Sequence, residues 1–317
     1  MKKLIYYIGI LVCTSALLSS CIAEDRSNCP PEVITHSGLP VPQFVIVPIA
    51  GSNPAIVNDS LYTGQVYVFD DQGKFVASYQ IPGRPQLNKT YTPDWGLPAG
   101  NYTYAVWLND DKNFQLDPSV VGQSIQSQTL LQLIIPATKV VNNTNSIPFL
   151  CYGHLDNEYL DSTKNNLITI PVMQYTNKIN LKVTGLETTP GNDYTFSISD
   201  NNEGYGFDGA FASNDYFTYS TTNQVNSGVL NASLNVLKLA GNRQNPIITI
   251  TNNTTGETYS IGLIQAILAS NPSNDFDKTH VYNITMTNPF GNETEIPLTI
   301  TINDWVVDMS NNDLNIN

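Results

Sequence analysis

The sequence has 317 residues, of which 41% are hydrophobic and only 13% are charged. Its length favours about two domains, and its apolar content is sufficient for sizeable cores. The chain has 14 basic residues against 27 acidic ones, which argues against nucleic acid or an anionic lipid surface as a partner. Abundant Thr, Tyr, Ile and Val, with few runs of strong helix formers, argue against a helical bundle.

The chain begins with the pattern of a bacterial secretion signal that ends in a lipid attachment site. Two lysines precede an apolar stretch, residues 4–18, which is too short and too interrupted by Ser and Thr for a transmembrane helix. Ser19-Ser20-Cys21 resembles the lipobox of lipoproteins, in which the Cys takes a diacylglycerol. We expect a signal peptide over residues 1–20 and lipidation of Cys21 with acyl chains such as palmitate, which anchors the protein in the outer membrane. An ordinary secretory signal with a chance Cys is the alternative.

Two cysteines, Cys29 and Cys151, remain in the mature chain once Cys21 is lipidated. An even pair in an oxidising compartment predicts a disulfide that pins the N-terminus to the first domain. Closing so long a loop stabilises by about 4–5 kcal/mol in the chain-entropy model. Two unpaired, buried thiols are the alternative. Neither Cys has a second Cys or a His at ligand spacing, so we expect no metal and no cofactor.

Alternation of apolar and polar residues predicts strands along most of the mature chain. Asp70-Asp71-Gln72-Gly73 lies between two such runs and is typical of a hairpin turn. The best helix candidate is Ile261–Ala269, which Pro272 ends. The expected strands, in chain order, are Gln43–Ile49, Gln65–Phe69, Lys74–Tyr79, 102–106, Leu130–Ile135, Ile168–Met173, 178–184, Tyr194–Ile198, Val229–Leu239, Ile247–Thr251, Val281–Thr287 and 298–302.

These elements indicate an all-β fold of sandwiches or barrels. A polar run at Asp161–Asn166 and the segment Gln174–Asn177 are equally defensible domain boundaries. We place an N-terminal β-sandwich at residues 21–170 and a C-terminal β-sandwich at residues 171–317.

Residues that carry chemistry are sparse. His36, His154 and His280 are far apart in sequence and match no metal or catalytic spacing. Asp110–Asp117 bears a faint likeness to a calcium loop but lacks its Gly and terminal Glu. Other acidic pairs are better explained as turn or strand-end residues. We therefore predict no catalytic residue and no enzyme.

The aromatic residues leave two interpretations open. Tyr91 and Trp95, near a Pro-rich loop, could form a platform on which a sugar stacks. The favoured interpretation treats Trp107 and Trp305 as core residues and Trp95 as a residue that packs a loop.

Five segments in a fixed order resemble a known family: the lipobox with Asp25–Pro30, then Gln65–Val76, Gly96–Trp107, Lys178–Leu186 and Ile300–Trp305. The set is similar to the type V fimbrillin superfamily, and most closely to its lipid-anchored minor fimbrial subunits, the fimbrial anchor branch. The resemblance implies two tandem transthyretin-like Greek-key β-sandwich domains. It also implies assembly with other fimbrial subunits by donor-strand exchange, in which an extended segment of one subunit completes a sheet of the next.

The resemblance further implies that stalk subunits are freed by an Arg-specific cut after an N-terminal strand, whereas anchors keep their lipid. The only arginines are Arg26, Arg84 and Arg243, so no cut falls shortly after a first strand. This favours the anchor or an accessory subunit. The basic residue that the family often shows after the Met of its interdomain strand is missing at Met173-Gln174-Tyr175. Whether the polar tail Ser310–Asn317 belongs to a donor segment stays open.

The sequence therefore predicts a non-enzymatic structural subunit of cell-surface fimbriae, held by its lipid in the outer membrane. Its expected partners are other fimbrial subunits and the membrane, and the sequence names no host or bacterial adhesion ligand. An outer-membrane glycan-binding surface lipoprotein is the alternative. A surface hydrolase would require two facing carboxylates, and no feature of the sequence supports them.

Overall fold

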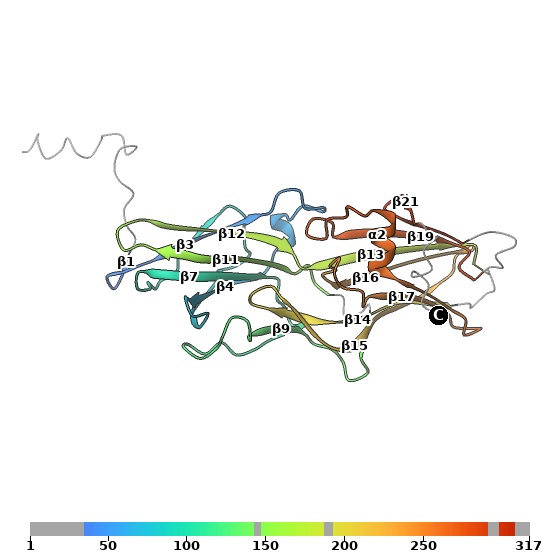
Figure 1. Cartoon of the computed structure of the whole chain (residues 1–317), viewed down its shortest axis with the longest axis horizontal. Helices are drawn as coiled ribbons and strands as arrows, with labels where there is room; N and C mark the ends of the chain where they lie inside the picture. Colours follow the sequence, from blue (N-terminus) through green and yellow to red (C-terminus); the bar gives the residue numbers. More distant parts are fainter. Residues whose placement is uncertain (1–34, 143–146, 187–192, 291–297, 308–317) are drawn as a thin grey trace, which may run out of the picture.

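The protein is all-β, as predicted. The structure, a computed structural model, describes residues 35–142, 147–186, 193–290 and 298–307. These residues form three main β-sheets and a small hairpin, with a single short α-helix. The molecule is elongated, and the strands of the first half of the chain lie at one end and most of the later strands at the other (Figure 1). Within the described part of the chain, no helix has the length and apolar character needed to span a bilayer.

The N-terminal half is built on one curled sheet of described strands, in the order β5-β4-β7-β11-β12-β3-β6. Alternate side chains of these strands, such as Phe44 and Ile46 on β3, are fully buried in one cluster. Phe44 lies on β3, the next-to-last strand of this order, and Tyr79 on β5, the first, yet their ring centroids are 6.0 Å apart. The sheet therefore wraps around this cluster. The strands are β3 (Pro42–Pro48), β4 (Gly64–Asp70), β5 (Phe75–Gln80), β6 (Thr90–Tyr91), β7 (Gly100–Leu108), β11 (Cys151–Leu160) and β12 (Asn166–Gln174), with the hairpin β1 (Thr35–His36) and β2 (Leu39–Pro40) before them and the 3-10 helix η2 (Asn58–Ser60) after β3.

The C-terminal half packs two sheets face to face. The described strands of one run in the order β16-β13-β19-β20-β21, and those of the other in the order β10-β15-β14-β17-β18. Helix α2 (Leu263–Ser270) follows β18 directly and contacts β20, so it covers one edge between the sheets. The strands are β10 (Val140–Asn142), β13 (Thr176–Thr184), β14 (Asp193–Gly206), β15 (Phe211–Gln224), β16 (Val229–Leu237), β17 (Ile247–Asn252), β18 (Thr258–Gly262), β19 (Val281–Thr287), β20 (Thr299–Ile302) and β21 (Trp305–Val306).

Two long strands tie the halves together. β14 and β15 have 14 residues each, and the end of β14 reaches the N-terminal half, where it pairs with β9 (Leu130–Leu133). β9 pairs in turn with β8 (Phe114–Leu116). Gly204 allows this pairing, because a Cβ at its position would lie 2.1 Å from the carbonyl oxygen of Leu131. One sheet is therefore shared by both halves.

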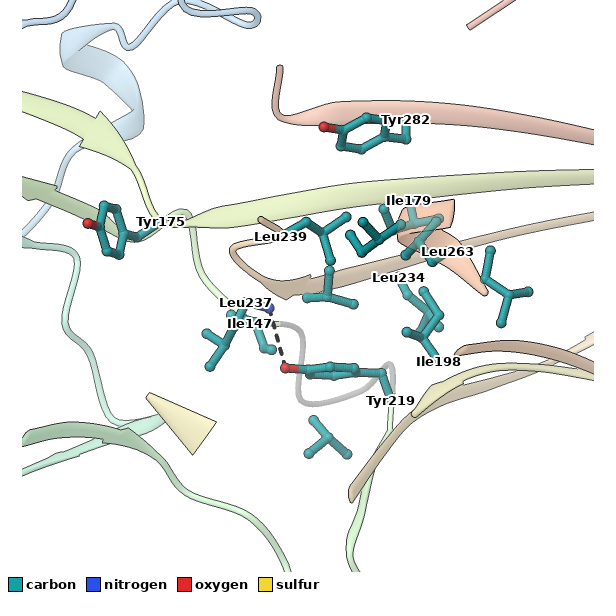
Figure 2. Close-up of a cluster of buried hydrophobic side chains, with 14 of the residues drawn as sticks. Ile147, Tyr175, Ile179, Ile198, Tyr219, Leu234, Leu237, Leu239, Leu263 and Tyr282 are labelled. Atoms are coloured by element: carbon teal, nitrogen blue, oxygen red, sulfur yellow. Dashed lines mark hydrogen bonds between the residues drawn. The ribbon is translucent and has the colours of Figure 1, made fainter. Parts of the chain in front are cut away.

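The second hydrophobic cluster also crosses the junction. Trp107 of the N-terminal half is fully buried, and its ring stacks 5.7 Å from that of Tyr205 on β14. Phe207, which follows β14, packs with its ring 4.6 Å from that of Tyr67. The cluster continues into the C-terminal half, where the Tyr219 hydroxyl accepts a hydrogen bond of 3.3 Å from the Leu237 amide (Figure 2). The two halves thus share a continuous core.

Most predicted elements are confirmed, with boundaries shifted by a few residues. The predicted strand Val281–Thr287 is β19 residue for residue, and the predicted helix is α2 shifted by one or two residues. β11 and β15 were not predicted. The chain passes from the curled sheet to the five-stranded sheet at Tyr175, between β12 and β13. The division into domains at residues 170 and 171 stays a prediction.

Candidate functional site

The first long strand, β3, is built into the fold. It pairs in parallel with β12 over seven residues, from Pro42 opposite Asn166 to Pro48 opposite Val172. Phe44 and Ile46 are 0% exposed, and burying two such side chains stabilises by about 3–6 kcal/mol. Removing β3 would therefore open a long apolar groove in the curled sheet.

The loop after β3 fastens the N-terminal half to the C-terminal half. The Asn53 amide donates to the Lys278 carbonyl at 2.7 Å, and the His280 amide donates to the Asn53 carbonyl at 2.9 Å. Asn53 and Thr279 form an isolated parallel bridge. Because this loop continues directly from β3, the strand and the contact with the C-terminal half form one continuous segment.

The two arginines in the described part of the chain are both engaged. The Arg84 guanidinium donates to the carbonyls of Leu61 at 3.1 Å and Asp59 at 3.0 Å, and Pro85 follows it in sequence. Arg243 is 9% exposed and pairs with Asp200 at 2.7 Å. Arg243 is therefore shielded in the folded chain, whereas Arg84 is exposed and lies after β5, well beyond the first long strand.

The last described hairpin presents apolar side chains to solvent. Asn303 and Asp304 turn the chain from β20 to β21 with positive φ angles of 48° and 68°. Trp305 and Val306 are 64% and 66% exposed. The expectation that Trp305 belongs to the core is therefore wrong. β21 is the outermost described strand of its sheet, so no described strand covers its free edge. Trp107, by contrast, is a core residue as expected, and residues 310–317 lie outside the described residues.

The predicted lipid and disulfide sites cannot be placed. Cys21 and Cys29 lie outside the described residues, as does the signal peptide. Cys151 is a free, fully buried thiol at the start of β11, and burial raises its pKa.

The geometry sets a condition on the predicted Cys29–Cys151 bridge, which stays a prediction. β1 lies at the outer end of the N-terminal half (Figure 1), whereas Cys151 pairs with Gln174, next to the point where the chain passes into the five-stranded sheet. The strand registers place Thr35 and Cys151 roughly 30 Å apart along the sheet. The six residues from Cys29 to Thr35 span at most about 20 Å. With the roughly 6 Å that a disulfide adds between Cα atoms, the bridge requires an almost fully extended segment before Thr35.

The structure does not bring the three histidines together. His36 is exposed on β1, and His154 lies on β11 with its Nε2 atom 3.4 Å from Asp156. His280 is fully buried, and neither ring nitrogen has a hydrogen-bond partner. Burial, followed by the nearby Lys238 ammonium, lowers the pKa of His280 to about 4. Among the described residues, no group of His, Cys, Asp or Glu could hold a metal ion.

The acidic loop after β7 uses its carboxylates within the protein. Asp111 accepts a hydrogen bond from the Asn113 amide at 2.8 Å, and Asp117 accepts one from the Leu130 amide at 3.0 Å. These contacts are those of turn residues. Burial raises the pKa of Asp110 to about 6.

The candidate sugar platform is occupied by packing contacts. Tyr91 is 4% exposed, and its hydroxyl accepts a hydrogen bond from the Gln86 amide at 2.7 Å. Trp95 is half-buried, with its ring 6.4 Å from that of Phe44. Trp95 therefore packs a loop against the curled sheet, as the favoured interpretation has it.

Together these features define a class of protein: an elongated all-β module with a buried first long strand, a braced junction and an exposed terminal hairpin. Solved structures share this fold. A candidate polysaccharide-binding protein from Bacteroides thetaiotaomicron matches with a TM-score of 0.70 at 19% identity, over 86% of this chain and 99% of that one. The fimbrial anchor protein Mfa2 from Porphyromonas gingivalis matches with a TM-score of 0.68 at 21% identity, over 84% of this chain and 99% of that one. A candidate adhesin from Bacteroides ovatus gives 0.65 at 21% identity, over 86% and 98%.

The sequence itself identifies the family. Residues 51–311 match the family of Fimbrillin-A associated anchor proteins Mfa1 and Mfa2. The chain belongs to this family and is a fimbrial subunit, as the ordered motifs predict. No curated protein matches the chain.

Proposed function

We propose that the protein is the lipid-anchored base of a fimbrium. In this proposal it is held in the outer membrane by acyl chains on Cys21 and joins neighbouring fimbrial subunits by β-strand addition. Its two halves correspond to tandem transthyretin-like Greek-key domains, and its role is structural rather than enzymatic.

The observation that carries the proposal is the burial of the first long strand, β3, in its own sheet. β3 fills the curled sheet with Phe44 and Ile46, and the loop after it is hydrogen-bonded to the C-terminal half. Arg243 is buried in its pair with Asp200, and a cut after the exposed Arg84, which Pro85 follows, would fall after β5 and remove β4 and β5 together with β3. A subunit that keeps this strand has no open groove in its curled sheet. It therefore accepts no donor strand there and is the last subunit of the fibre on that side.

The terminal hairpin supports a donor role at the other end. Trp305 and Val306 lie on the outermost described strand of the five-stranded sheet and are largely exposed. An exposed Trp and Val on a short edge strand are better explained by contact with another subunit than by a surface that faces only water.

The direct test is the intact mass of the chain purified from its own membranes with attached fibres. We expect a mature chain that begins at an acylated Cys21. A Cys21→Ser variant should release fibres into the medium, and a Cys13→Ser variant, altered within the signal, should not. A mature chain that begins after Arg26 without lipid, or fibres retained equally by both variants, would contradict the anchor assignment.

A further inference from the structure

One face of the C-terminal half differs in charge from the rest of this acidic protein. We call the outward side chains of β13, β16 and β19 the lysine face, because they include Lys178 and Lys182. These three strands contain no Asp or Glu, although the whole chain carries a net charge of −13. A polyanion repelled elsewhere by the molecule can approach here. Asp304, in the turn after β20, lies two strands away from β13.

The two lysines of this face are free to bind an anion. Both are exposed, and neither forms an ion pair with a described residue. They are four residues apart on one strand, so they point the same way at a spacing of about 13 Å. Elsewhere in the described structure the lysines at positions 139, 164, 238 and 278 each pair with an aspartate.

Between the lysines the surface is an ordered array of amides and hydroxyls. The Ser233 hydroxyl donates to the Asn180 side-chain oxygen at 2.9 Å, and the Asn180 amide donates to the Asn283 side-chain oxygen at 2.8 Å. Asn231 lies directly opposite Lys182 on β16. Because these side chains hold one another in place, their remaining donors and acceptors are fixed in position for a ligand.

A cleft of about 140 Å³ adjoins the lysine face at Lys178. It lies between the two halves, and its walls include Phe149 and Pro148 from one side and Asn235 and Val281 from the other. An apolar wall opposite amide and ammonium groups suits a ring that is apolar on one side and hydroxylated at its edge.

We propose that the lysine face binds an anionic polysaccharide. The strands offer two cations and many hydrogen-bonding groups, which match carboxylates or sulfates on a hydroxyl-rich chain. A protein partner is less well matched, since protein interfaces are centred on aromatic or large apolar anchors. The apolar outward residues of these strands are the half-buried valines 229 and 281. This proposal does not depend on the anchor assignment.

Native affinity electrophoresis of the full mature chain in gels containing polygalacturonate tests the proposal, with dextran as the neutral control. We expect the polyuronate to retard the chain and dextran not to. Raising the ionic strength from about 0.01 M to about 1 M shortens the Debye length from about 30 Å to about 3 Å and should abolish the retardation.

Three variants locate the site. A Lys178→Gln/Lys182→Gln variant should bind about tenfold more weakly, because it loses two exposed charge contacts. Asn231→Asp, which places a carboxylate beside Lys182, should also weaken binding. Lys74→Gln/Lys112→Gln carries the same net charge as the first variant and should bind like the unaltered chain. Absence of retardation, equal retardation in dextran, or equal binding by the two double variants would overturn the proposal.

Discussion

Phe207 offers a direct test of whether the two halves are one cooperative unit. It follows β14, is fully buried, and packs on Tyr67, Phe69 and Trp107 of the N-terminal half at ring distances of 4.6, 5.8 and 6.2 Å. Its carbonyl also accepts the Tyr152 hydroxyl at 2.6 Å. Phe207→Ala leaves a cavity at the junction and should lower the free energy of unfolding by about 3–5 kcal/mol.

The assay is urea unfolding followed by tryptophan fluorescence and by circular dichroism. We expect one transition by both probes, before and after the substitution, because the shared core links the halves. A double-mutant cycle of Phe207→Ala with Tyr67→Leu should give a coupling of about 0.5–1.5 kcal/mol.

Phe196 is the matched control, because it is equally buried and lies on β14, the strand that Phe207 follows. It lies eleven residues before Phe207, roughly 35 Å away along the chain direction of β14. Phe196→Ala should cost as much stability but couple to Tyr67 by less than about 0.5 kcal/mol. Two separate transitions, or equal coupling of both phenylalanines to Tyr67, would refute the shared core.

Further predictions concern single side chains. Asp110→Asn should raise the free energy of unfolding by about 1–3 kcal/mol at pH 7 but not at pH 4. The folded-state pKa of Asp110 is about 6, so ionising this carboxyl as pH rises from 4 to 6 destabilises the fold. Equal effects in urea titrations at both pH values would count against this. Because the pKa of His280 is lowered to about 4, the free energy of unfolding should fall as pH falls from 6.5 to 4. In urea titrations over this pH range, His280→Gln should remove that part of the dependence. Trp305→Ser should change monomer stability by less than about 0.5 kcal/mol but reduce co-purification with fibres; undiminished co-purification would exclude a contact there. Alkylation of the denatured, unreduced chain should label neither Cys29 nor Cys151 if the predicted bridge forms, and mass spectrometry that finds both labelled would rule it out.

The alternation of residues located the strands that are buried on one side and polar on the other. In β13 and β19 every second side chain enters the core, so the pattern is regular. β11 lacks that pattern, because its register shifts between Leu155 and Glu158 and its charged outer half faces solvent. β15 is rich in Asn, Ser and Thr, and it owes its place mainly to pairing with β14.

The features that matter most for the candidate site depend on contacts between distant residues. The pairing of Gly204 with β9 joins segments more than seventy residues apart, and no local period reveals it. Alternating Gly and aromatic residues at 204–207 are the one local signal of a close approach. Trp305 was misplaced because its burial would require a neighbouring strand, and β21 has none on its outer edge among the described strands. Alternation alone places Lys178 and Lys182 on one face of a strand, but only the register places β16 and β19, which lack Asp and Glu, on either side of them.

The braced junction follows from what an anchor has to withstand. In the proposed arrangement, tension enters at the terminal hairpin β21 in the C-terminal half and leaves through the lipid, which precedes β1 of the N-terminal half in the chain (Figure 1). The force therefore has to cross from the C-terminal to the N-terminal half. Covalent crossings alone, at Tyr175 and on either side of β10, would leave the two halves free to move as separate bodies. The shared sheet of β14 and β9, the aromatic core around Trp107 and the hydrogen-bonded loop at Asn53 give three further connections. The separation of the halves then requires all three to break together, which is the cooperativity that the Phe207 cycle measures.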